Sequence, residues 1–164
     1  MPQPGHVIDS AAFAREGGRL EGEVDLAGLR RLDDVLAERT GTLHYAVTGV
    51  AVDRELFLDL AVRGVLRLRC QRCLEPMEFP IDLNSRFLLV EAGQDWPDDE
   101  LEEDRFDAIE ANKAMDLWTL VEDDVLLALP IAPRHEDCAQ LAAAPKHADA
   151  LPFAALAGLK ATRH

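Results

Sequence analysis

The chain has 164 residues, a formal net charge of -14 and 48% hydrophobic residues, which is enough for one domain with its own core. It contains no apolar run of about eighteen residues and no signal-peptide pattern at its start, so we expect neither a transmembrane helix nor export. These features predict a cytoplasmic protein with reduced cysteines, and they argue against DNA or a membrane as a partner. The oligomeric state stays open.

The N-terminal part of the chain predicts three short elements. One strand is expected at residues 6–10 and another at residues 19–26. Residues 29–37 carry apolar side chains at helical spacing, which predicts a short helix. These side chains are Leu29, Leu32, Val35 and Leu36.

The central part of the chain predicts long strands. Apolar side chains alternate with polar or small ones over residues 43–47, 56–70 and 77–89, and a turn is expected at residues 53–54. A period of two is typical of strands that bury one face. Because the connections are short, the three strands predict an antiparallel meander.

The C-terminal half begins with an acidic segment. Residues 92–107 contain eight acids and one arginine, a composition that predicts a mobile loop. A short strand is expected at residues 106–110, and Asp116 predicts the N-cap of a helix that ends at Pro130. We expect the carboxylates of residues 122–124 to be exposed. The helix residues expected to face the sheet are Leu117, Leu120, Val121 and Leu127.

These elements predict an α+β fold, in which an antiparallel β-meander of long strands has a helix packed on one face. Residues 1–138 are expected to form the single domain, with the acidic mobile loop at 92–107. Residues 139–164 are interpreted as a linker followed by a short C-terminal helix. Its apolar stripe, Phe153, Leu156 and Leu159, is too short to fold alone and predicts docking on this domain or on a partner.

Cys70 and Cys73 form a Cys-x-x-Cys pair where one long strand ends and the next begins. Two thiolates at a hairpin tip are typical of a zinc knuckle, and a structural zinc ion needs four ligands. His135 and Cys138 offer two more at ligand-like spacing, which makes these four residues a candidate zinc site. A redox dithiol is one alternative, although the prolines after the pair oppose the helix on which such dithiols usually sit. Simple packing of Cys70 in the core is another.

Four arginines stand near the cysteine pair. Arg63, Arg67 and Arg69 have the parity opposite to the buried residues, and Arg72 lies at the tip. A basic strand face of this kind can bind RNA phosphates through forked guanidinium contacts. The alternative is a solvated face on which the arginines pair with acids of the next strand, Glu75, Glu78 and Asp82.

Three blocks of the sequence carry a family resemblance: RCQRCLEP, DLWTLVEDDVLLALPIAPRHEDC and LPFAALAGLK. Together, and in this order, they resemble the YceD family, the large ribosomal RNA subunit accumulation proteins. The resemblance covers most of residues 20–160. It implies a role in the synthesis, processing or stability of large-subunit ribosomal RNA, with that RNA or a ribosomal protein as partner and no established catalytic activity. It does not imply metal ligands, since this chain has HEDC where many members carry a further cysteine pair.

The sequence thus predicts a non-enzymatic ribosome-biogenesis factor. Two other functions remain as alternatives. One is a thiol-redox protein that uses Cys70 and Cys73. The other is a zinc-stabilised adaptor for protein interactions without RNA contact.

Overall fold

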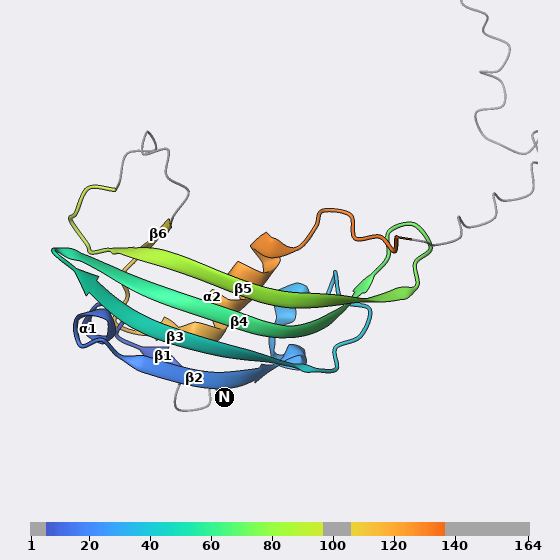
Figure 1. Ribbon diagram of the computed structural model, residues 1–164, viewed down its shortest axis with the longest axis horizontal. Coiled ribbons are helices and arrows are strands. Elements are labelled where there is room, and N and C mark those ends of the chain that lie inside the picture. The colour runs from blue at the N-terminus through green and yellow to red at the C-terminus, as the bar shows by residue number, and fades with distance from the viewer. Residues whose placement is uncertain (1–5, 97–105, 137–164) are drawn as a thin grey trace, which may run out of the picture.

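The computed structural model describes residues 6–96 and 106–136, and its centre is a five-stranded sheet (Figure 1). Neighbouring strands are antiparallel from the first to the fourth, whereas the fifth runs parallel to the fourth. The α+β fold with a meander of long strands is therefore confirmed. In spatial order the strands are β2 (Arg19–Asp25), β3 (Thr42–Val52), β4 (Glu55–Arg69), β5 (Pro76–Val90) and β6 (Asp107–Glu110).

Side-chain alternation gives the sheet one buried face. In β4 the even-numbered leucines point inward, and Leu58 and Leu66 are fully buried. The register pairs Leu58 with Phe87 and Leu66 with Phe79, so the inward side chains of β4 and β5 meet in one layer. We call the opposite face the open face. Its side chains include Glu21, His44, Asp59, Arg63 and Asp82.

The helices pack on the buried face, behind the sheet as drawn in Figure 1. They are α1 (Ser10–Arg15), α2 (Leu117–Ala128) and the 3-10 turns η1 (Leu26–Gly28) and η2 (Arg30–Leu32). Two short strands, β1 (Val7–Ile8) and β7 (Met115–Asp116), pair beside them. Asp116 caps α2 as predicted, because its Oδ1 accepts a hydrogen bond from Trp118 N at 2.9 Å. The strand expected at 6–10 is shorter than predicted, since α1 begins at Ser10.

The helix predicted at residues 29–37 is wrong. Leu26, Leu29 and Leu32 are all buried, and their spacing of three fits consecutive 3-10 turns. Leu36 then forms a β-bridge with Leu68, so the chain leaves the turns and lies extended beside β4. Burial of the leucines therefore does not require an α-helix here.

The predicted orientation of α2 holds for its first turns only. Leu117, Leu120 and Val121 are buried against the sheet, but Leu127 is 81% exposed. Val125 takes the inward position near the helix end. The apolar character of Leu127 was therefore a poor guide to its orientation.

The carboxylates of α2 also differ from the prediction, because Glu122 and Asp124 are buried. Glu122 Oε1 accepts a hydrogen bond from Arg31 N at 2.7 Å, and Asp124 Oδ1 accepts one from Ser85 Oγ at 2.7 Å. These bonds offset part of the cost of removing the carboxylates from water.

The strand expected at 106–110 is confirmed as β6. Most of the predicted acidic loop lies outside the described residues, as do the predicted linker and C-terminal helix. No helix in the described part of the chain has the length and apolar character needed to span a membrane.

Candidate metal centre

The connection between β4 and β5 brings Cys70 and Cys73 close together. Cys70 N donates to Glu75 O at 3.0 Å, and Leu74 N donates to Cys70 O at 2.9 Å, which closes the connection. Leu74 adopts a left-handed conformation with φ of 65°, so the chain reverses sharply before β5. The cysteine pair therefore lies at a hairpin tip, as the sequence predicted.

The segment after α2 places His135 at the same tip. Gln71 N donates to Pro133 O at 2.8 Å, which holds this segment against the connection. His135 Nδ1 lies 3.4 Å from Cys73 Sγ. The ligand atoms of Cys70, Cys73 and His135 all lie within 4.8 Å of one another. Three of the four predicted ligands thus converge, and the fourth, Cys138, lies outside the described residues.

The second nitrogen of His135 fixes the tautomer of the ring. Nε2 lies 3.2 Å from Pro76 O, and a carbonyl oxygen can only accept, so Nε2 carries the proton. In the neutral ring Nδ1 then has a free lone pair, which faces the thiols. Metal-bound histidines almost always donate their other N–H to an acceptor of this kind. The orientation of His135 therefore suits a metal ligand.

The surroundings of Cys70 favour its thiolate. Burial raises the pKa of this thiol, but hydrogen bonds from the backbone at Cys73, His135 and Arg72 outweigh that effect and lower the pKa to about 5. One of them is visible as Arg72 N, which lies 3.5 Å from Cys70 Sγ. The thiolate is the form that binds metal.

The dimensions of the cluster fit zinc after a small closure. Tetrahedral zinc, with bonds of about 2.3 Å to sulfur and about 2.0 Å to nitrogen, places its ligand atoms about 3.5–3.8 Å apart. The separation of 3.4 Å between Cys73 Sγ and His135 Nδ1 lies just below this range. The other ligand-atom separations are at most 4.8 Å, so binding of zinc requires the side chains to close by about 1 Å.

The same geometry bears on the redox alternative. In a redox dithiol the thiol of low pKa is the accessible nucleophile. Here Cys70 is fully buried, so its thiol is not accessible as a nucleophile. The arrangement therefore favours a ligand role over thiol exchange.

The arginines predicted to bind RNA are placed on the open face or at the tip. Arg63 Nε lies 3.0 Å from Asp82 Oδ1, and Arg67 contacts Glu38 at 3.2 Å and Glu78 at 3.6 Å. Asp82 and Glu78 belong to the neighbouring strand β5, and they are two of the three acids named in the alternative of a solvated, ion-paired face. These side chains are well exposed, so the ion pairs are weak and exchangeable.

The other two arginines flank the cysteine cluster. Arg69 ends β4, and Arg72 stands between the two cysteines. Their positive charge suits a site that gathers thiolates. RNA contact by these four arginines stays a prediction.

The family comparison matches residues 58–160 to the large ribosomal RNA subunit accumulation protein YceD. The match begins inside β4 and includes the cysteine tip, β5, α2 and His135. It covers more than half of the chain. This protein belongs to the YceD family. Searches among curated proteins and among solved structures gave no match. The resemblance noted in the sequence is thus confirmed, and the family is named for accumulation of large-subunit ribosomal RNA.

Some contacts of the candidate metal centre could not be predicted from the sequence. The Pro76 carbonyl and the backbone N–H groups around Cys70 act through main-chain atoms, which any residue type supplies. The predicted docking residues Phe153, Leu156 and Leu159 lie outside the described residues.

Proposed function

We propose that this YceD protein is a non-enzymatic cytoplasmic factor that supports the synthesis, processing or stability of large-subunit ribosomal RNA. The family match over residues 58–160 carries this proposal. The burial of Cys70 gives further support, because a buried thiol favours a structural role over catalysis.

We also propose that Cys70, Cys73 and His135 hold a zinc ion, with Cys138 as the fourth ligand. The support is the convergence of three ligand atoms and the tautomer of His135. A bound zinc ion would cross-link parts of the fold that are far apart in sequence. In this arrangement the chain contributes thiolates favoured by backbone N–H groups, and an imidazole held in place by Pro76 O.

Affinity purification from a lysate, with and without ribonuclease, tests the proposed role. We expect large-subunit ribosomal RNA precursors or large-subunit ribosomal proteins to be enriched over their small-subunit counterparts. Loss of the enrichment after ribonuclease treatment identifies RNA as the direct ligand, whereas retained ribosomal proteins identify a protein ligand. Equal recovery of both subunits would contradict the proposal.

Elemental analysis of protein purified without chelator under reducing conditions tests the zinc site. We expect about one zinc per chain, as four protein ligands imply. His135→Ala should lose most of this zinc. His44→Ala is the matched control, because His44 is an exposed histidine on the open face that pairs with Glu23. Absence of zinc from the unaltered protein, or equal loss in both variants, would refute the site.

A further inference from the structure

The outer edge of β2 is open within the described part of the chain, where β2 pairs only with β3. Its backbone polarity follows from two bonds that extend the β2–β3 register. Gly49 N donates to Gly18 O at 2.8 Å, and Leu26 N donates to Gly41 O at 3.0 Å. Residues that bond to the neighbour alternate along an antiparallel strand. The even-numbered residues of β2 therefore bond to β3, and the odd-numbered residues point their N–H and C=O groups away from the sheet.

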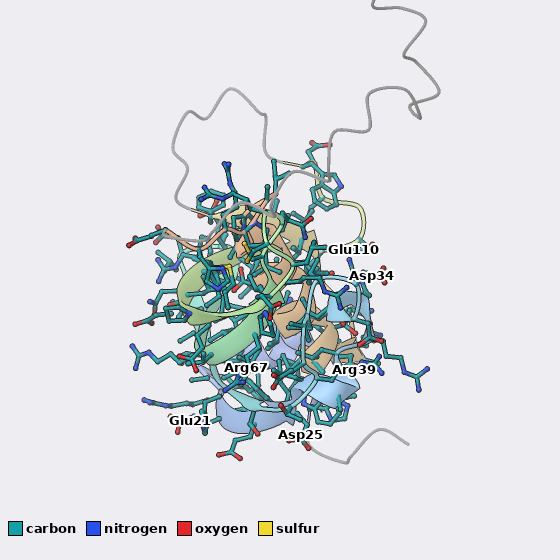
Figure 2. All side chains as sticks on the ribbon, turned by 90° about the vertical axis from the view of Figure 1, so that its right-hand side faces the viewer. Glu21, Asp25, Asp34, Arg39, Arg67 and Glu110 are labelled. Carbon is teal, nitrogen blue, oxygen red and sulfur yellow. The ribbon has the colours of Figure 1, made fainter. Side chains whose placement is uncertain are left out.

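The outward-bonding residues are also the charged ones. Arg19, Glu21, Glu23 and Asp25 all have exposed side chains on the open face. Figure 2 shows Glu21 and Asp25 at the lower edge of the sheet, which is formed by β2. Glu110 of β6, the strand at the other edge, lies above them. The free edge thus offers hydrogen-bonding groups and a row of carboxylates at the same positions.

Weak contacts currently engage these carboxylates. Glu21 pairs with Arg19 at 2.8 Å, and Glu23 lies 3.1 Å from His44 Nδ1. All of these side chains are more than 60% exposed, and pairs of this kind contribute little free energy. A partner's cation can therefore replace the present contacts at low cost.

A hollow on the open face lies directly beside this edge. It has a volume of about 540 Å³, and its floor includes the small residues Ala46 and Ala61. The charged or titratable side chains that line it are Arg19, Glu21, Glu23, His44 and Arg63. Ala46 of β3 is paired with Ala61 of β4, and these short side chains leave the surface of the hollow below that of its surroundings. Long side chains that extend from an added strand can lie over this floor while their charged ends reach the carboxylates.

The charges select the kind of strand that fits. If two copies of this chain paired through β2 along most of its length, Glu21 or Glu23 would face a carboxylate of the other copy, which is unfavourable. Nucleic acid is repelled by the same row. A strand with lysine or arginine at every second position places each cation opposite a carboxylate.

We propose that the β2 edge binds an extended basic protein segment, which joins the sheet as an additional strand with lysine or arginine opposite Glu21, Glu23 and Asp25. The backbone bonds hold the segment, and the charge pattern sets its register. The inference rests on the proposed function only for the cellular source of the segment, which would be a basic protein of the large ribosomal subunit.

Binding of a synthetic peptide to the full chain tests the edge. The probe peptide has lysine at every second position, and threonine or valine occupies the positions between the lysines. The control peptide has the same composition, but all of its lysines are consecutive. We expect the alternating peptide to bind more tightly at low salt. The double variant Glu21→Lys and Glu23→Lys should weaken binding by about tenfold or more. The matched variant Asp34→Lys and Glu55→Lys makes the same change in net charge at exposed acids elsewhere and should keep the affinity. Equal binding of both peptides, or equal loss in both variants, would reduce the effect to net charge and overturn the proposal.

Amide hydrogen exchange distinguishes strand addition from simple charge attraction, because charge attraction alone does not protect backbone amides. The amides of Glu21 and Glu23 should exchange rapidly in the free protein and become protected when the alternating peptide binds. Unchanged exchange at these amides would refute strand addition even if the peptide binds. Neither measurement depends on ribosomal RNA, so a failure here is distinct from a failure of the proposed function.

Discussion

Gly49→Ala is expected to destabilise the protein, because α1 crosses β3 at Gly49 with its backbone. A Cβ at this position would lie 2.4 Å from Phe13 O and 2.7 Å from the Cα of Ala14. Backbone atoms cannot move aside as a side-chain end can, so α1 must shift and lose packing of the fully buried Ala14. Overpacking of this kind costs about 1–3 kcal/mol. The lower entropy of the unfolded alanine chain offsets about 0.4–1 kcal/mol.

The net loss is therefore about 1–2 kcal/mol, which lowers the Tm of a domain of this size by about 2–8 °C. Thermal unfolding followed by circular dichroism measures this change. Gly28→Ala is the matched control, since the nearest atom to its added Cβ is Trp118 Cζ3 at 4.0 Å. It has the same effect on the unfolded chain and should leave the Tm unchanged or slightly higher. A Tm for Gly49→Ala equal to that of the control would show that α1 does not pack on β3 as described.

Three further predictions address charge and the end of the chain. Burial raises the pKa of the Asp124 carboxyl above its ordinary value of 3.8, the Ser85 hydrogen bond opposes this, and Asp107 adds to the rise. The folded state therefore binds this proton more tightly, and stability falls as pH rises from the unfolded to the folded pKa. Asp124→Asn should raise the Tm at neutral pH, and this gain should vanish below about pH 3.8; a gain independent of pH would contradict the assignment. If Arg63, Arg67, Arg69 and Arg72 contact RNA, the plot of log affinity against log salt should have a slope of about -3, and replacing all four by Gln should flatten it. If the affinity for ribosomal RNA is unchanged in this variant, the four arginines do not contact RNA and only form a solvated face. Deletion of residues 150–164 should leave the Tm nearly unchanged while it weakens association with a partner, whereas a large fall in Tm would place Phe153, Leu156 and Leu159 in the core.

The long strands were predictable because each buries one face, so that apolar residues recur at every second position of the sequence. That period persists over β4 and β5, where each inward side chain meets one from the neighbouring strand. The direction of β6 was not predictable in the same way. The sequence of its four residues does not indicate whether the strand pairs parallel or antiparallel with β5.

The errors in the helical regions have a common origin. The pattern of Leu29, Leu32 and Leu36 records burial, but both an α-helix and successive 3-10 turns bury such residues. In α2 the buried carboxylates depend on partners from distant segments, Arg31 for Glu122 and Ser85 for Asp124. No local pattern reveals such partners.

The candidate metal centre was partly predictable for a chemical reason. Thiols and imidazoles are uncommon in this chain, so the spacing of the cysteine pair and of His135 stood out. Their convergence depends on the path of the chain after α2, which the sequence does not specify. The structure brings His135 to the tip through the bond between Gln71 N and Pro133 O.

The ratio of large-subunit to small-subunit ribosomal RNA after depletion of this protein tests the central claim most directly. The account predicts that the ratio falls on depletion and recovers when the unaltered gene is restored, while an empty vector gives no recovery. A ratio that stays constant through depletion, in cells where loss of the protein is verified, would contradict a role in large-subunit ribosomal RNA accumulation.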